Sequence, residues 1–420
     1  MSYKDKYRPW LADGRPPMVG ELGSPLSYKP LLCLSCSCDD CPPLEDRSNW
    51  PVIYFDKNAS GDNDGSSWAN AIEDIAEVKN YPLHQCHIKG HGSGDKYTVT
   101  GNLIDFEEQS YYYLANDSAD DLYFDFRIKD AVCSYFKGII IDTFNTTGCY
   151  YALDYWAGVG FDYCIFEDCI SENNGGGWQI WNSSVDNCKG NNSTDYSGMV
   201  LAGCTVTDCE ANNNNQNGMG GSSASFTDCE ASGNGDYGFY GSSSTFIRCI
   251  ADGNENCGFY SFSRSTLTDC QAINGGRQGY RIANGATLDG CTADGNSYEG
   301  FLTVYNSDFT DCVADNSVNN EGFRDCYNSV FSGCTADGND DDGFQDCDDS
   351  DFTDCEATNN GEFGFRNNTD SDFDTCTATG NYYCGFKNSG ASYASITSSG
   401  NCTSSNPNCT VGDPSYYCDY

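Results

Sequence analysis

Basic residues are scarce in this sequence of 420 residues, which has 21 Lys and Arg against 62 Asp and Glu and a formal net charge of −41. Binding to phosphates needs clustered Lys and Arg, so an isoelectric point near 4.1 argues against a nucleic-acid partner. No run of about 18 apolar residues occurs. With a mean hydropathy of −0.55, we expect no membrane insertion.

The first 50 residues lack the apolar stretch of about 7–15 residues that a secretory signal peptide needs. We therefore expect synthesis in the cytoplasm without a recognisable signal peptide. Residues 1–49 are rich in Pro and lack periodicity, yet include Trp10 and Leu31-Leu32. This composition predicts an extended arm that becomes ordered by docking onto another structural subunit.

Aromatic residues, by contrast, are plentiful, with 29 Tyr, 23 Phe and 6 Trp, which excludes a disordered acidic chain. The dominant pattern is a repeat of about 21 residues. It is marked by eleven cysteines that recur at intervals of 19–22 residues: Cys169, Cys188, Cys209, Cys229, Cys249, Cys270, Cys291, Cys312, Cys334, Cys355 and Cys376.

Each cysteine lies in a similar frame. An apolar residue usually stands three positions before it, Ala two after it, and a Gly-aromatic pair follows further on. Asn is common five positions after it, as at Asn214, Asn234, Asn254, Asn296, Asn339, Asn360 and Asn381. Leu is scarce and no 3.6-residue period is present, which argues against leucine-rich and helical repeats.

Three short apolar clusters per repeat predict a coil of three strands and three turns. Successive coils would stack as parallel strands about 4.8 Å apart. Equivalent residues then form ladders of Phe, Cys, Ala and Asn. We expect the Asn ladder to occupy a tight turn, because Asn tolerates φ > 0 and its amide can bond to the next coil. Buried Phe residues, each worth roughly 1.5–3 kcal/mol, should be the main stabilising element.

Residues 52–71 resemble the opening of the pectate-lyase-like superfamily of right-handed parallel β-helices. They consist of a strand-like Val52-Ile-Tyr-Phe55, a Gly- and Asp-rich loop, and Ser67-Trp-Ala-Asn-Ala71. The resemblance implies a right-handed helix and a capping helix over residues 67–76, and it extends over roughly residues 50–400. It implies no activity, because the superfamily includes lyases, hydrolases, phage tailspikes and adhesins.

The predicted fold class is therefore all-β. We expect a right-handed parallel β-helix solenoid with coils of about 21 residues, an N-terminal capping helix and an extended N-terminal arm. The predicted domains are the arm at 1–49, the cap at 50–100, the β-helix at 101–400 and a Cys-containing tail at 401–420.

Pectin hydrolases of this fold carry Asn-Thr-Asp, an Asp pair, Gly-His-Gly and Arg-Ile-Lys in that order. This chain holds the same pieces in another order: Asn368-Thr369-Asp370, Asp341-Asp342, Gly90-His91-Gly92 and Arg127-Ile128-Lys129. His91 and Asp370 would lie near opposite ends of the solenoid, whereas glycoside hydrolysis needs carboxylates about 5–10 Å apart. The matches are interpreted as coincidence.

A lyase needs a basic residue to abstract a proton. From Val200 onward the Arg and Lys residues are Arg248, Arg264, Arg277, Arg281, Arg324, Arg366 and Lys387. Arg277 and Arg281 are close in sequence and could face a groove, with a solvated turn as the other interpretation. A surface of this charge repels acidic polymers unless cations intervene. A site assembled from acids at equivalent positions on different coils, such as Asp308, Asp351 and Asp372, stays open.

Two segments could hold metal ions. Cys33, Cys36, Cys38 and Cys41 form two Cys-x-x-Cys pairs that could bind zinc, although the pairs are close together for one tetrahedral centre. Disulfides or free thiols are the alternatives there. Asp340, Asp341 and Asp342 offer hard oxygen ligands suited to calcium, with a solvated acidic face as the other interpretation.

The ladder cysteines, Cys209 to Cys376, are interpreted as free buried thiols that pack as small hydrophobic groups. Side chains that point the same way make poor disulfide geometry.

The sequence favours a non-enzymatic structural or attachment protein. We expect a virion fibre, spike or decoration subunit on the virion or another extracellular surface assembly. Its partners would be structural subunits, reached through the arm, a cell-surface glycan, and further copies in a homo-oligomer. A polysaccharide depolymerase and a secreted adhesin or filament subunit are the alternatives.

Overall fold

A computed structural model describes residues 52–56, 58–62, 65–73, 164–172, 177–282, 284–387 and 391–401, with the strands between residues 85 and 162 and at 416–417. All the regular secondary structure of these residues is β-strand. The chain divides into two compact units. Unit 1 comprises Met1–Phe144, Tyr151–Cys169 and Gln179–Ser184, and unit 2 comprises Asn145–Tyr150, Ile170–Trp178 and Val185–Tyr420.

In unit 1, parallel strands pair in the order β1-β2-β4-β7-β11. Strand β6 pairs with β3 and with β9, and strand β5 pairs with β8. Its strands are β1 (Val52–Phe55), β2 (Gln85–Gly90), β3 (Leu103–Asp105), β4 (Tyr111–Asn116), β5 (Leu122–Phe124), β6 (Arg127–Lys129), β7 (Tyr135–Lys137), β8 (Ile139–Asp142), β9 (Leu153–Asp154), β10 (Phe161–Asp162) and β11 (Ile165–Glu167). Strands β13 (Trp178–Trp181) and β14 (Ser184–Asp186) have residues in both units.

The expected capping helix is not present over residues 67–73, which form bends and a turn. Ile72 pairs with β1 instead. Its N–H donates to the Tyr54 carbonyl oxygen at 2.9 Å, and its own carbonyl accepts from the Asp56 N–H at 3.1 Å. These bonds take the backbone groups that a helix would need. Residues 74–76 lie outside the described residues.

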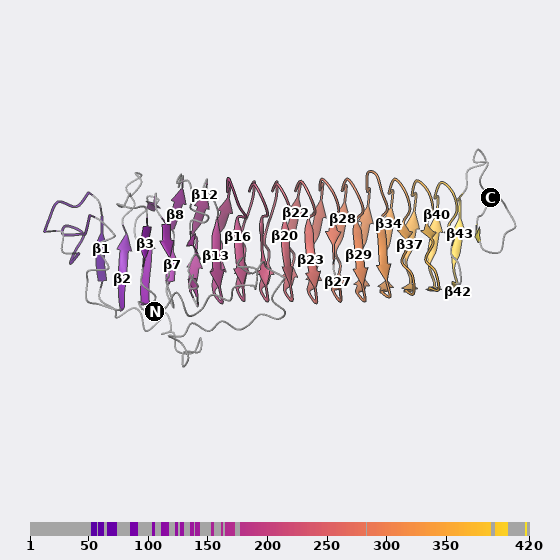
Figure 1. The fold of residues 1–420 in the computed structure, drawn as a ribbon, viewed down its shortest axis with the longest axis horizontal. Coiled ribbons are helices and arrows are strands. Elements are labelled where there is room, and N and C mark those ends of the chain that lie inside the picture. The colour runs from indigo at the N-terminus through magenta and orange to yellow at the C-terminus, as the bar shows by residue number, and fades with distance from the viewer. Residues whose placement is uncertain are drawn as a thin grey trace, which may run out of the picture. The chain divides into compact units, whose positions relative to one another are not determined.

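Unit 2 is a stack of coils built from three parallel sheets (Figure 1, magenta to yellow). Sheet 1 comprises β17 (Thr205–Thr207), β19 (Ser225–Thr227), β21 (Thr245–Ile247), β24 (Thr266–Thr268), β27 (Thr287–Asp289), β30 (Asp308–Thr310), β33 (Val330–Ser332), β36 (Asp351–Thr353), β39 (Asp372–Asp374) and β42 (Ser392–Ala394).

Sheet 2 comprises β22 (Ile250–Asp252), β25 (Gln271–Ile273), β28 (Thr292–Asp294), β31 (Val313–Asp315), β34 (Thr335–Asp337), β37 (Glu356–Thr358), β40 (Thr377–Thr379) and β43 (Thr397–Ser399). Sheet 3 comprises β16 (Met199–Ala202), β18 (Met219–Ser222), β20 (Phe239–Ser242), β23 (Phe259–Ser263), β26 (Tyr280–Arg281), β29 (Phe301–Tyr305), β32 (Phe323–Tyr327), β35 (Phe344–Gln345), β38 (Phe365–Arg366) and β41 (Phe386–Lys387). The paired strands β12 (Ile170–Glu172) and β15 (Lys189–Asn191) also belong to unit 2, and β44 (Tyr416–Tyr417) pairs antiparallel with β41.

Most coils therefore contain three short strands and three turns, as the repeat predicts. In the coils of Glu210 and Glu230, an isolated bridge takes the place of the sheet 2 strand. The register is that of the sequence repeat, with Thr287 opposite Asp308 and Ala293 opposite Ala314. Many turns contain a residue with positive φ, such as Gly290 at 61°. Other coils place Asp or Asn there, which tolerate this conformation. The Gly before each aromatic is required by space, because a Cβ on Gly343 would lie 2.7 Å from the Gly364 carbonyl oxygen.

Two aromatic ladders fill the interior of unit 2. Phe309 on sheet 1 stacks on Phe331 of the next coil, with ring centroids 4.8 Å apart and planes 2° from parallel. It also meets Phe323 of sheet 3 edge-on at 5.8 Å. All three side chains are at most 1 % exposed. The prediction of inward-facing, stacked Phe residues is confirmed, and their burial provides the hydrophobic stabilisation of the coil.

Candidate functional site

A row of buried carboxyl groups lies in the turns that lead into sheet 3. Glu299, Glu321 and Asp342 each directly precede the Gly of a Gly-Phe pair, so they occupy equivalent positions on three consecutive coils. Their exposed fractions are 5 %, 5 % and 0 %. We call these three residues the carboxyl row. Carboxylates are rarely this buried unless they are paired.

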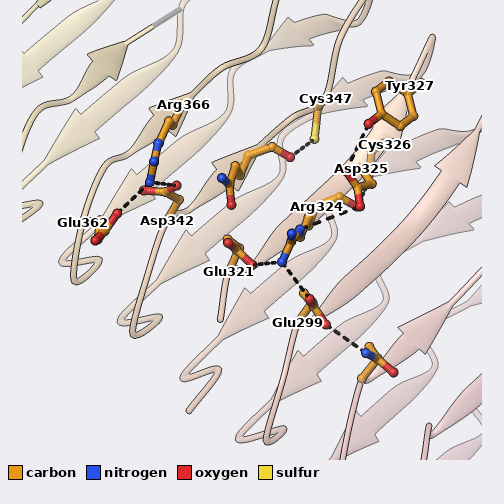
Figure 2. Close-up of polar contacts among 12 residues, drawn as sticks. Glu299, Glu321, Arg324, Asp325, Cys326, Tyr327, Asp342, Cys347, Glu362 and Arg366 are labelled. Atoms are coloured by element: carbon orange, nitrogen blue, oxygen red, sulfur yellow. Dashed lines mark hydrogen bonds and ion pairs between the residues drawn. The ribbon is translucent and has the colours of Figure 1, made fainter. Parts of the chain in front are cut away.

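Arg324 on β32 is the partner of the first two (Figure 2). Its Nη1 lies 3.3 Å from Glu299 Oε1 and 3.4 Å from Glu321 Oε2. Its Nε lies 3.7 Å from Asp325 Oδ2. Gln278 donates from Nε2 to the other Glu299 oxygen at 3.0 Å. One guanidinium thus links two neighbouring coils through their acids.

Arg366 on β38 forms an ion pair with Asp342, the third residue of the carboxyl row. Its Nη1 lies 3.3 Å from Asp342 Oδ2 and 2.7 Å from Glu362 Oε2. The Phe363 N–H donates to Asp342 Oδ1 at 2.8 Å. Both oxygens of this fully buried carboxyl therefore have partners.

Burial raises the pKa of Glu321 to about 7 and that of Asp342 to about 7. The cause is loss of hydration, which disfavours the charged form, and the nearby guanidiniums offset only part of it. Near neutral pH these two carboxyl groups are therefore partly protonated. Neutral carboxylic acids can donate hydrogen bonds as well as accept them.

The two arginines belong to a longer outward-facing column on sheet 3. In-register pairing aligns one residue from each coil, and we call this set the outer column: Tyr260, Arg281, Leu302, Arg324, Gln345, Arg366 and Lys387. From Val200 onward the sequence has seven Arg and Lys residues, and four of them lie in this column. With Lys189, unit 2 has eight such residues, so a single face of an acidic unit collects half of its positive charge.

Aromatic rings flank the outer column. Arg281 lies over the Tyr260 ring at 5.7 Å, and Arg366 and Lys387 lie over the Phe363 ring at 5.2 and 4.9 Å. Tyr305, which is 43 % exposed, stacks on Tyr327 at 5.3 Å. The face therefore combines flat apolar rings with charged hydrogen-bonding groups.

The proposed calcium ligands do not form one cluster. Asp342 is buried against Arg366, whereas Asp340 is exposed and Asp341 half-buried. The expectation of a solvated acidic face is wrong for Asp342, because the turn directs its carboxyl inward. No group of three or more His, Cys, Asp or Glu residues that could hold a metal ion occurs among the described residues. The proposed zinc ligands Cys33, Cys36, Cys38 and Cys41 lie outside the described residues.

The ladder cysteines are buried free thiols. They are Cys209, Cys229, Cys249, Cys270, Cys291, Cys312, Cys334, Cys355 and Cys376. The Cys312 Sγ lies 3.6 Å from the Leu288 carbonyl oxygen and 3.4 Å from that of Thr310. Burial raises the pKa of this thiol well above its ordinary value, which keeps it protonated. Its surroundings suit a packing role rather than a reactive one.

The asparagine ladder links coils through side-chain amides. It includes Asn234, Asn254, Asn296, Asn339, Asn360 and Asn381, each at most 1 % exposed. Asn360 donates from Nδ2 to the Ala336 carbonyl oxygen and to Asn381 Oδ1, at 3.1 and 2.9 Å. Its Oδ1 accepts from the N–H and Nδ2 of Asn339, at 3.1 and 3.0 Å.

The expectation of positive φ at the ladder asparagines is wrong. The left-handed residue is the one before, such as Gly338 at 66° or Asn359 at 53°. That residue turns the chain, and the ladder Asn can then direct its amide into the interior.

The carboxyl row and its two arginines were not identified from the sequence as a site. The sequence feature that could have identified them is the pair of positions directly before and directly after each Gly-aromatic pair. The residues at these positions differ from coil to coil, so a search for repeated residues does not find them.

Residues 168–320 match the family model described as right handed beta helix region. The fold is a right-handed parallel β-helix. This confirms the fold that the resemblance implied, and the family description names no activity. No curated protein is similar enough to the chain to count as a match.

Several solved structures are similar to this chain at low identity. The A-module of mannuronan C-5 epimerase from Azotobacter vinelandii is 12 % identical with a TM-score of 0.43, over 86 % of this chain and 100 % of that one. The receptor-binding domain of the Siphovirus 9NA tailspike is 10 % identical with a TM-score of 0.40, over 89 % and 80 %.

An α-1,3-glucanase from Streptomyces thermodiastaticus is 12 % identical with a TM-score of 0.32, over 85 % and 68 %. Enzymes and a viral protein thus occur together among these structures, and none of the likenesses assigns an activity to this chain.

No helix long and apolar enough to cross a membrane is found in the part of the chain that the structure describes.

Proposed function

We propose that this protein is a structural attachment protein, a virion fibre, spike or decoration subunit, that binds a glycan through sheet 3. The observation that carries the proposal is the outer column. Its side chains are repeated in register along unit 2, and they combine cations with flanking aromatic rings. Sugar binding requires polar groups that fix the orientation of the sugar and aromatic rings that stack on its apolar face.

The coil geometry supports a ligand that lies along the axis. Equivalent side chains recur at about 4.8 Å from coil to coil. A linear glycan could therefore repeat similar contacts on successive coils, and weak contacts would add up. In this proposal residues 1–49 join the protein to other structural subunits.

Polysaccharide cleavage is the second candidate, and one observation favours it. Glu321 and Asp342 lie on neighbouring coils, and burial raises the pKa of each to about 7, a value suited to a general acid. Their side chains are, however, 6 % and 0 % exposed, so a sugar could reach them only if the arginines moved. Attachment without cleavage fits this burial better.

The test is incubation of the purified chain with a broad glycan panel, with and without Ca²⁺. Binding is followed together with release of reducing ends and of unsaturated products. We expect binding without release. Product release would replace the proposal by the depolymerase, and absence of binding to every glycan would refute both.

A further inference from the structure

Positive charge recurs at every second coil along part of the outer column. Arg281 lies on β26, Arg324 on β32 and Arg366 on β38. The intervening coils place Leu302 and Gln345 at the same position. Two coils correspond to about 9–10 Å along the axis. This repeat is about the length of two sugar rings in an extended polysaccharide.

The inference rests on the proposed glycan binding and names the ligand class. We propose that the outer column binds a linear polysaccharide that carries an acidic group on every second sugar and lies along the axis of unit 2. The acidic groups would meet Arg281, Arg324 and Arg366 in turn. The uncharged sugars between them would lie over Leu302 and Gln345.

The guanidiniums keep donors for such a ligand. Arg324 and Arg366 make all their hydrogen bonds through Nη1, so their Nη2 groups have no hydrogen-bond partner among the described residues. About a third of each side chain is exposed, 35 % and 30 %. Arg281 is exposed, and its guanidinium lies over the Tyr260 ring. Guanidiniums held in place from below are well suited to bind carboxylate or sulfate from above.

Five acids contact Arg324 and Arg366, and two of them, Glu321 and Asp342, offset the positive charge only in part. Since burial raises the pKa of Glu321 and Asp342 to about 7, each is uncharged for part of the time near neutral pH. The Oε1 atom of Gln345, between the two arginines, is buried without a hydrogen-bond partner. A small rotation of this amide toward a sugar hydroxyl would satisfy it.

The rest of the molecule disfavours other polymers. A polyanion with a charge on every sugar would place half its charges over Leu302 and Gln345, on a chain with a net charge of −41. A neutral polymer would leave the guanidiniums unused. Alternating charge therefore distinguishes the proposed ligand from fully charged polymers and from neutral ones.

The experiment measures binding of the full chain to three sets of size-matched fragments by isothermal titration calorimetry. The probes are hyaluronan, with a carboxylate on alternate sugars, polygalacturonate, with one on every sugar, and dextran, which is neutral. We expect hyaluronan to bind at least about tenfold more tightly than either of the others. Because the contact is electrostatic, this preference should shrink as salt rises from about 0.05 to 0.5 M.

Arg281→Gln is the decisive variant, because among the described residues this side chain forms no ion pair with the carboxyl row, so its replacement leaves that row unchanged. We expect it to weaken hyaluronan binding about tenfold and to leave dextran binding unchanged. Arg248→Gln is the matched control. Arg248 pairs with Asp228 at 2.6 Å, lies outside the outer column, and should have no effect. Arg324→Gln should weaken binding further, with circular dichroism checking that the chain folds without the guanidinium beside Glu299 and Glu321.

Equal binding of all three polymers, unchanged by Arg281→Gln, would overturn this inference and leave glycan binding intact. Binding of polygalacturonate as tight as that of hyaluronan would overturn the alternating-charge assignment. If no member of the broader glycan panel binds, the proposed function fails as well.

Discussion

Replacing Asn360 by Ala tests whether the asparagine ladder holds neighbouring coils together. The Asn360 side chain is 1 % exposed and takes part in four hydrogen bonds, two as donor and two as acceptor. Ala removes all four. The backbone N–H of Asn339 and one hydrogen of its amide would then be buried without a partner.

A buried donor left without a partner costs roughly 1–3 kcal/mol. Two stranded donors predict a loss of about 2–6 kcal/mol in the free energy of unfolding. Asn381 Oδ1 loses the bond from Asn360 Nδ2 but keeps the one from the Asn360 N–H at 3.0 Å, so the greater damage lies on the side toward Asn339. Hydrogen exchange should therefore accelerate at the Asn339 amide more than at the Asn381 amide.

The assay is urea unfolding of the full chain, followed by far-ultraviolet circular dichroism. Asn319→Ala is the control, because this Asn is exposed and makes one bond, from Nδ2 to the Ser297 carbonyl oxygen at 2.8 Å. It should change stability by less than about 0.5 kcal/mol. If Asn360→Ala costs no more than the control, the ladder contributes no net stability and the reasoning is refuted.

Three further predictions concern the core and the carboxyl row. Phe309→Ala should lower stability by roughly 3–5 kcal/mol, because it removes a buried ring that stacks in one aromatic ladder and packs edge-on against the other; an unchanged thermal unfolding curve would contradict this. The double change Cys291→Ala and Cys312→Ala should leave a folded solenoid by circular dichroism, since small apolar groups suit both positions, and loss of the fold would mean that the thiols are bonded or metallated. Because burial raises the pKa of Glu321 and of Asp342 to about 7 in the folded state, well above the ordinary carboxyl range, the folded state binds these protons more tightly than the unfolded state. Stability should be highest below about pH 4 for these groups and fall, by up to about 3–4 kcal/mol for each group, as the pH rises from about 4 to about 7. Conversion of both to amides should remove that part of the pH dependence of the unfolding temperature, and the same slope in the double variant would contradict the assignment.

The solenoid could be predicted from the sequence because a repeat of this kind is a local pattern that recurs. The regular spacing of Cys291 and Cys312 sets the register, and a period-two alternation within each strand decides which residues face inward. Phe309 and Phe331 are therefore predicted to stack, and they do. Because similar coils stack on one another, the inward-facing positions predicted for one coil recur in the next.

What depends on the fold in three dimensions is how nonrepeating residues combine between coils. Asp342 reads as one of several exposed acids in a run, yet its turn directs it against Arg366, which is 24 residues further on. Likewise, Arg281, Arg324 and Arg366 are separate cations in the sequence, and only the parallel register of sheet 3 aligns them in one column. The repeating scaffold can be predicted from local patterns, because each coil obeys the same local rules. The charged face cannot, because its geometry arises where residues from different coils meet.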